Sequence, residues 1–169
     1  MKAASLPKSA GSRSWPRQQV VPRIVRDATV AWEGSLSRGA GVAKAGTGAF
    51  ELSVDLPSRI GDPGGKTSPE ELLAAAHASC FVTSLGSELH RAGTPAERVD
   101  VHCTITMDEV DGKGHFIVAS AISARVVAPG ADDAILVAAA AAADEGCPFS
   151  ALIRASATVT VEATLEGGS

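Results

Sequence analysis

Two cysteines in unlike surroundings are the residues of this chain best suited to chemistry. Cys80 lies in a run of small residues, 74–81, and Cys147 lies in the glycine- and proline-containing segment 146–150. Sixty-six residues lie between them, so they form no CxxC motif, and a bond between them requires the fold to join distant segments. The pair therefore suggests thiol redox chemistry, with a disulfide that is either structural or working.

Length and composition bear on that choice. The chain has 169 residues and three cysteines, an odd and sparse count that differs from the dense frameworks of small secreted domains. At 45% hydrophobic residues, one domain of this length buries enough apolar surface to fold without cross-links. A disulfide is therefore not required for folding.

The N-terminal segment is basic and has no acidic residues. Residues 1–26 hold six Lys and Arg residues and no acidic residue. Because they lack the apolar central region of a secretory signal, we predict a flexible basic tail over 1–23 and one domain over 24–169. A weaker alternative for the tail is an organelle transit peptide, whose composition is also basic and poor in acids.

The charge and hydropathy of the remaining chain exclude two kinds of partner. Residues 27–169 carry nine basic and nineteen acidic residues, a net charge of −10, which repels nucleic acid. His77 and Ser79 interrupt the most apolar segment, which argues against a membrane span. We therefore expect a cytoplasmic protein, and in that reducing compartment a disulfide is more often catalytic than structural.

The pattern of apolar residues and turn signals predicts an α+β domain. Ser68 as N-cap, Pro69 in the first turn and Glu71 of a capping box mark the start of a helix that runs to about Arg91. Its segment 72–85 is apolar or small all round, which is typical of a helix buried in the domain centre. The expected strands are 24–33, 42–45, 49–54, 99–107, 115–127 and 155–165, and a second helix is expected over 131–145. This βββ-α-ββ-α-β order predicts an antiparallel β-sheet wrapped around long buried helices.

Each cysteine also has a plain structural interpretation. Cys80 in mid-helix is a small buried hydrophobe unless a positive neighbour stabilises its thiolate, and Arg38 in a glycine-flanked turn is a candidate for that neighbour. An arginine in a turn is more commonly solvated surface. Cys147, directly before Pro148, gains thiolate character if it caps a short helix, and its plain interpretation is an incidental, half-buried thiol in a loop. We assign no role to Cys103.

The sequence resembles the osmotically inducible protein C and organic hydroperoxide resistance family (OsmC/Ohr) of thiol peroxidases, and is closer to the OsmC branch. The resemblance covers about residues 24–166. Four blocks carry it: Ala31-Trp32-Glu33-Gly34 with Arg38-Gly39-Ala40-Gly41, Thr67-Ser68-Pro69-Glu70-Glu71-Leu72, Ala75-Ala76-His77-Ala78-Ser79-Cys80-Phe81, and Gly146-Cys147-Pro148-Phe149-Ser150.

The resemblance implies a fold, an activity and a set of site residues. Cys80 would be the peroxidatic thiolate and Cys147 the resolving thiol, with Arg38 stabilising the thiolate and Glu70 holding Arg38. The substrates would be organic hydroperoxides and, more weakly, hydrogen peroxide, in oxidative or osmotic stress defence. A dithiol, for which the family suggests a lipoyl protein, would reduce the Cys80–Cys147 disulfide, and no cofactor is expected.

Helix geometry adds a prediction about assembly. Ten residues separate Glu70 from Cys80 on one helix, which places them about 15 Å apart along its axis. Because they cannot meet within one chain, a site that uses both requires a second subunit. We therefore predict an intertwined homodimer with an active site at each interface.

Two further interpretations of the domain remain open. The domain can be non-catalytic, with a structural Cys80–Cys147 disulfide, or it can bind a metal through His77, Cys80, Cys147 and another histidine. For His77 itself, one helical turn before Cys80, a buried and hydrogen-bonded ring is favoured over a catalytic base. An apolar pocket wall that includes Phe81 and Phe149 would favour alkyl or lipid hydroperoxides.

Overall fold

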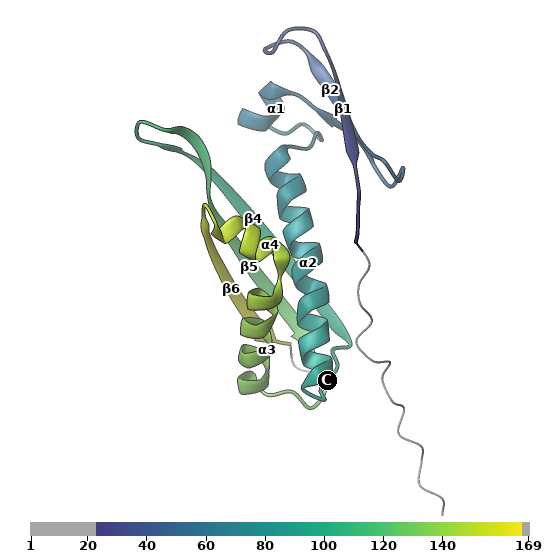
Figure 1. Ribbon diagram of the computed structural model, residues 1–169, viewed down its shortest axis with the longest axis vertical. Coiled ribbons are helices and arrows are strands. Elements are labelled where there is room, and N and C mark those ends of the chain that lie inside the picture. The colour runs from purple at the N-terminus through teal and green to yellow at the C-terminus, as the bar shows by residue number, and fades with distance from the viewer. Residues whose placement is uncertain (1–22, 167–169) are drawn as a thin grey trace, which may run out of the picture.

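The structure is a computed structural model that describes residues 23–166, so nearly all of the predicted basic tail lies outside the described residues. Six strands and four helices form two unequal parts (Figure 1). In chain order they are β1 (Ala28–Glu33), β2 (Ala40–Ala45), β3 (Glu51–Val54), α1 (Leu56–Ile60), α2 (Pro69–Arg91), β4 (Arg98–Val110), β5 (Gly114–Val127), α3 (Asp133–Gly146), α4 (Pro148–Arg154) and β6 (Thr158–Leu165).

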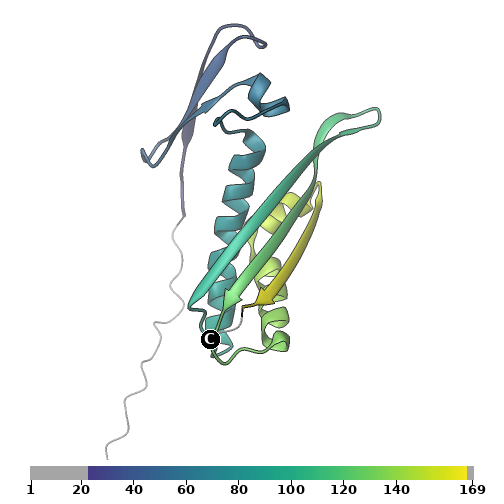
Figure 2. The same cartoon turned by 180° about the vertical axis from the view of Figure 1, so that it is seen from behind.

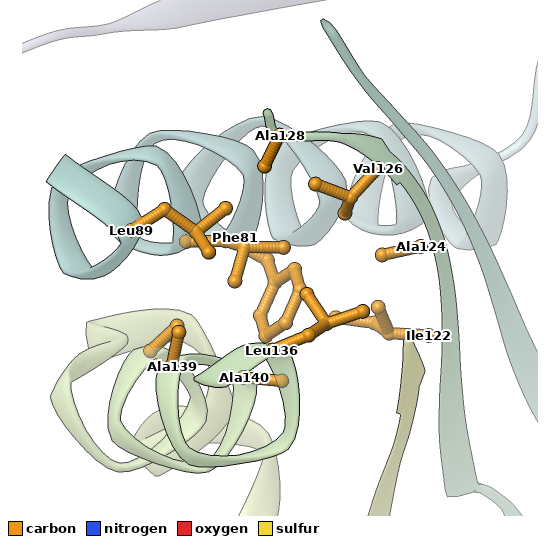
Figure 3. Packing of buried hydrophobic residues seen from close by; sticks show 11 residues of the cluster. Phe81, Leu89, Ile122, Ala124, Val126, Ala128, Leu136, Ala139 and Ala140 are labelled. Carbon is orange, nitrogen blue, oxygen red and sulfur yellow. The ribbon is translucent and has the colours of Figure 1, made fainter. Parts of the chain in front are cut away.

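The larger part is a sheet in the order β4-β5-β6 with a layer of helices on one face (Figure 2). Helix α2 packs against β4, and α3 lies beside α2 and packs against β6. The core lies between the layers, where Phe81 of α2 and Leu136 of α3 meet Ile122 and Val126 of β5 (Figure 3). The α+β class and the predicted element order are therefore confirmed, with the short helices α1 and α4 added.

One strand differs in direction from the predicted antiparallel sheet. The β4–β5 hairpin is antiparallel, whereas β6 pairs parallel to β5, with Ala119 opposite Thr158 and Val126 opposite Leu165. The chain leaves β5, crosses the sheet through α3 and α4, and returns at the end where β5 began. Two strands joined by such a helical crossover lie parallel.

Helix α2 begins as predicted and ends at Arg91. The Ser68 hydroxyl caps it by accepting the Glu71 amide at 3.2 Å, while the Glu71 carboxylate accepts a hydrogen bond from Thr67 at 2.7 Å. This N-cap bond satisfies one of the free amides of the first turn, so the local signals suffice to fix the start of the helix.

The burial of α2 differs from the prediction of a helix enclosed on all sides. Within one chain its fully buried residues form one stripe, at His77, Phe81, Leu85 and Leu89. The opposite side, apolar or small in sequence, is exposed or half-buried. By length and composition α2 could also cross a membrane, a property that it shares with core helices of soluble proteins. In this structure its buried stripe packs on the β4-β5-β6 sheet.

The smaller part is the sheet β1-β2-β3, which lies at the N-terminal end of α2 and away from the second sheet (Figure 1). Strand β1 is exposed along its whole length, and Val30, Trp32, Leu36 and Phe50 of this part are all exposed. Other apolar side chains of the sheet are covered, since Ala43 is buried and Leu52 and Val54 are half-buried. Within the described residues, the exposed apolar side chains form a surface that a partner could cover.

Candidate active site

The two cysteines that the sequence singled out lie together. Cys80 is half-buried on α2, and its thiol lies beside the thiol of Cys147, close enough for the two to interact. Cys147 is fully buried at the sharp junction of α3 and α4, whose axes meet at 68°. It is the N-cap residue of α4, as the Cys-Pro sequence predicted, and both sulfurs are free thiols in this structure.

The surroundings of Cys80 do not activate it within one chain. Its pKa is raised, first by burial and then by the hydrogen bond with the Cys147 thiol, while the backbone N–H of Phe149 opposes the rise by donating to the sulfur. None of the groups in residues 23–166 that shift this pKa is a cation. A thiol in this setting is mostly protonated at neutral pH, and a positive charge must approach before it becomes a good nucleophile.

A buried polar cluster lies behind the cysteine pair. The fully buried ring of His77 bonds Ser120 of β5 through Nδ1 and Ser150 of α4 through Nε2, both at 2.8 Å. Cys103 of β4 approaches the same cluster, with its sulfur 3.4 Å from Ser120 Oγ. The prediction of a buried, hydrogen-bonded His77 is confirmed, and burial lowers its pKa, so the ring is neutral at pH 7.

Glu70 takes an unpredicted partner in this chain. Its carboxylate forms a bidentate pair with Arg59 of α1, with Nη2 to Oε1 at 2.6 Å, and Nη2 of Arg59 also lies 3.5 Å from the sulfur of Met107 on β4. The hydrogen bonds from Arg59 lower the pKa of Glu70, so this carboxylate is ionised and acceptor-only at neutral pH. Arg59 thus fixes the orientation of the one carboxylate that the sequence assigned to the site.

Arg38 lies in a tightly built turn between β1 and β2, with its side chain exposed. A Cβ on the neighbouring Gly39 would lie 2.4 Å from the carbonyl oxygen of Glu33 and 2.7 Å from Trp32 Nε1, so glycine is required there. The Trp32 indole N–H donates to the Gly34 carbonyl at 3.2 Å and closes the turn. Arg38 is not among the groups that shift the pKa of the Cys80 of its own chain, and its pairing with Glu70 stays a prediction.

The structure therefore joins some of the predicted site residues and separates others. Cys80 and Cys147 meet, whereas Glu70 lies in the first turn of α2 and Arg38 lies between β1 and β2. The start of α2 and the β1-β2-β3 sheet lie at the same end of the molecule (Figure 1). The expectation that Phe81 lines an open pocket is wrong, because its side chain is fully buried in the core (Figure 3). Phe149 is half-buried and contacts Cys80 through its backbone.

Sequence reasoning missed three polar residues around this site, Arg59, Ser120 and Ser150. A signal existed for Ser150, which follows Cys147 by three residues and so falls one turn into the capped helix. Asp55 caps α1 by accepting the Ser58 amide at 2.7 Å, and that Asp-x-x-Ser spacing could have shown the helix that carries Arg59. Ser120 lies in a long strand with no distinguishing local pattern.

The metal-binding alternative finds no support in the described part of the chain. Within residues 23–166, no group of three or more His, Cys, Asp or Glu side chains is placed to hold a metal ion. Both ring nitrogens of His77, the histidine that this alternative needed, are already bonded to serine hydroxyls.

Comparisons of sequence and of structure both find similarity to OsmC-like proteins. The model of the family described as OsmC-like protein matches residues 61–162. The chain is 33% identical over 130 residues to peroxiredoxin OsmC of Escherichia coli (strain K12), covering 76% of this chain and 89% of that protein. It is 29% identical over 116 residues to the organic hydroperoxide resistance protein of Xanthomonas axonopodis pv. citri (strain 306), covering 67% and 78%.

Solved structures share the fold. An organic hydroperoxide resistance protein OsmC of Legionella pneumophila matches with a TM-score of 0.68 at 24% identity, over 84% of this chain and 99% of that chain. OhrB of Bacillus subtilis matches with a TM-score of 0.63 at 20% identity, over 82% and 98%. With the family model and the E. coli relative in agreement, the chain belongs to the OsmC-like protein family, as its four sequence blocks predicted.

Proposed function

We propose that this protein is a thiol-dependent peroxidase that reduces organic hydroperoxides, and hydrogen peroxide more weakly, in a reducing compartment such as the cytoplasm. Its relatives named peroxiredoxin OsmC and organic hydroperoxide resistance protein support this class of activity. The observation that carries the proposal is the contact between the thiols of Cys80 and Cys147, two residues that are distant in sequence. The test is dithiol-dependent consumption of an alkyl hydroperoxide, measured beside hydrogen peroxide.

The proposed reaction uses both sulfurs. The Cys80 thiolate attacks the distal peroxide oxygen, the O–O bond breaks, and the proximal oxygen takes a proton and leaves as the alcohol. The Cys147 sulfur then attacks the Cys80 sulfenic acid, so that an S–S bond forms, the S–O bond breaks and water leaves. A dithiol reductant supplies the two electrons and two protons that return the pair to thiols.

The proposal includes a homodimer, which three features of the single chain support. Glu70 and Cys80 lie on one straight helix about 15 Å apart along its axis. The small-residue side of α2 is incompletely covered, and the β1-β2-β3 sheet exposes apolar side chains that include Val30 and Leu36. A second copy that places its own β1-β2-β3 end against Cys80 would cover both surfaces and bring Arg38 and Glu70 to the thiol.

In this arrangement the partner chain supplies the positive charge that Cys80 lacks. A cation within about 4–6 Å lowers the pKa of an acid by about 1 to 3, which offsets the rise caused by burial. We expect Arg38→Met to shift the pH profile of Cys80 alkylation to higher pH, so that the rate at pH 7 falls about tenfold or more. Iodoacetamide labelling of Cys80 across pH 5–10, read by peptide mass, measures it. An unshifted profile would remove Arg38 from the site.

The shared site predicts complementation between two inactive variants. Cys80→Ser and Glu70→Ala chains, co-expressed with different tags and purified as the mixed dimer, should regain about half of the wild-type activity. The Cys80 of the second chain then meets the intact Glu70 of the first. Each variant alone should be strongly impaired. A mixed dimer as inactive as its parents would place Glu70 in the site of its own chain, against the proposed geometry.

A further inference from the structure

His77 joins three elements, helix α2, strand β5 and helix α4, through two buried side-chain hydrogen bonds. Its backbone belongs to α2, one turn before Cys80, and its two ring nitrogens reach Ser120 on the sheet and Ser150 on α4. All three side chains are fully buried, with no measurable solvent exposure. A buried hydrogen bond whose partners cannot turn to water fixes the relative position of the elements that it joins.

Ser150 belongs to the segment that meets Cys80. It is the third residue of α4, whose N-cap is Cys147, and it follows Phe149, whose N–H donates to the Cys80 sulfur. Besides the Phe149 N–H that donates to the Cys80 sulfur, the seven-residue helix α4 is tethered to α3 by the ion pair of Arg154 with Asp144 at 2.6 Å, which is partly exposed. Exposed ion pairs hold a position weakly.

We propose that His77 is a positioning residue that, through Ser150, holds the start of α4 against Cys80 and so sets how readily Cys147 closes the disulfide. The proposal rests on the proposed peroxidase function only for its biological meaning, because the Cys80–Cys147 pairing can be measured without peroxide. In the disulfide step the Cys147 sulfur must approach the Cys80 sulfur from the side opposite the departing oxygen. A small displacement of α4 therefore lowers the effective concentration of the Cys147 sulfur near the Cys80 sulfur, and the disulfide forms less readily.

The neutral state of the ring fits this role. A neutral imidazole carries one N–H donor and one acceptor nitrogen, while each serine hydroxyl can donate or accept. Both ring nitrogens can therefore be satisfied at once, with one serine donating and the other accepting. The hydrogen bonds of the cluster require neither a charged ring nor a water molecule. His77 is therefore better suited to holding α2 and α4 in a fixed relative position than to transferring a proton.

Two serine variants make a matched test. Ser150→Ala and Ser120→Ala each remove one buried hydrogen bond of the same length to the same ring, but only Ser150 lies on α4. The measurement is the equilibrium constant for forming the Cys80–Cys147 disulfide in a redox buffer of reduced and oxidised dithiothreitol, read by mass. Loss of one such bond should lower that constant about five- to tenfold in Ser150→Ala, and less than about twofold in Ser120→Ala.

Variants of His77 itself give a second readout. His77→Gln keeps an amide near the position of Nε2 and should retain most of the wild-type constant, whereas His77→Leu should resemble Ser150→Ala. In single-turnover reactions with an alkyl hydroperoxide, we expect Ser150→Ala to form the sulfenic acid at the wild-type rate. Its conversion to the disulfide should be slower by the same five- to tenfold.

The outcomes separate the two proposals. Equal losses in the Ser150 and Ser120 variants, or no loss in either, would overturn the positioning role, because the cluster would then be ordinary core. If His77→Gln is as impaired as His77→Leu, the hydrogen bond to Ser150 is not the cause, and the role is likewise overturned. If the wild type consumes no peroxide while the disulfide constant still falls only in Ser150→Ala, the positioning role stands and the peroxidase proposal fails.

Discussion

Cys80→Ser should lose peroxide turnover by at least about a thousandfold, the largest effect expected of any single substitution. The serine hydroxyl is far less acidic than a thiol and a far weaker nucleophile towards peroxide, so the first bond cannot form at a useful rate. Dithiol-coupled consumption of an alkyl hydroperoxide measures the loss, and thermal unfolding confirms that the variant is folded.

Cys103→Ser is the matched control for that loss. Cys103 lies on β4 with its sulfur 3.4 Å from Ser120 Oγ, and its pKa is raised by burial. A serine hydroxyl at that position keeps a hydrogen-bonding group next to Ser120 and touches neither Cys80 nor Cys147. We expect turnover within about twofold of wild type, as for other small changes outside a reacting pair. Equal losses at Cys80 and Cys103 would mean that the wrong thiol has been identified.

Cys147→Ser should give one fast turnover and then stall. The Cys80 thiolate still attacks peroxide, but its sulfenic acid has no thiol to condense with, so steady-state turnover falls by about a hundredfold or more. The stalled enzyme should carry one added oxygen on Cys80, visible by intact mass and trapped by a sulfenic-acid reagent. Excess peroxide should convert it to the sulfinic acid. A variant that cycles at the wild-type rate would show that Cys147 does not resolve the intermediate.

The same pair of cysteines distinguishes the structural alternative. If the Cys80–Cys147 disulfide only stabilises the fold, reductant should lower the free energy of unfolding by about 4 kcal/mol for a loop of this length, and no peroxide should be consumed. If the disulfide is instead a catalytic intermediate, reductant should leave the free energy of unfolding nearly unchanged while peroxide is consumed; Cys147 is buried and both thiols are free in this structure.

Most of the helices and strands could be predicted from short-range sequence patterns. The start of α2 could be predicted because Ser68, Pro69 and Glu71 act within one turn of each other, and the end of the helix follows from Gly93 at a positive φ of 81°. The direction of β6 was wrongly predicted as antiparallel, although the predicted strand-helix-strand order favours a parallel pair. The incomplete cover of α2 could not be predicted, because its sequence is apolar or small on all sides. Such a pattern does not show whether the chain itself or another molecule covers the helix.

The site was harder to predict because its partners are set by tertiary contact. The 66 residues between Cys80 and Cys147 do not show whether the two sulfurs are close in space. Their roles as an attacking and a resolving thiol came from the family resemblance. Glu70 was matched to Arg38 on the same grounds, whereas the structure places Arg59 beside it, on the five-residue helix α1. Helices this short have weak sequence signals, and charge partners follow the fold rather than the sequence order.

The most direct test of the central claim is peptide mapping after one equivalent of an alkyl hydroperoxide is added to the reduced protein. The account predicts loss of two hydrogens from the intact mass and a single cross-linked peptide that joins Cys80 to Cys147, with Cys103 still alkylatable. Full alkylation of both Cys80 and Cys147 after that treatment, or a disulfide that includes Cys103, would contradict it.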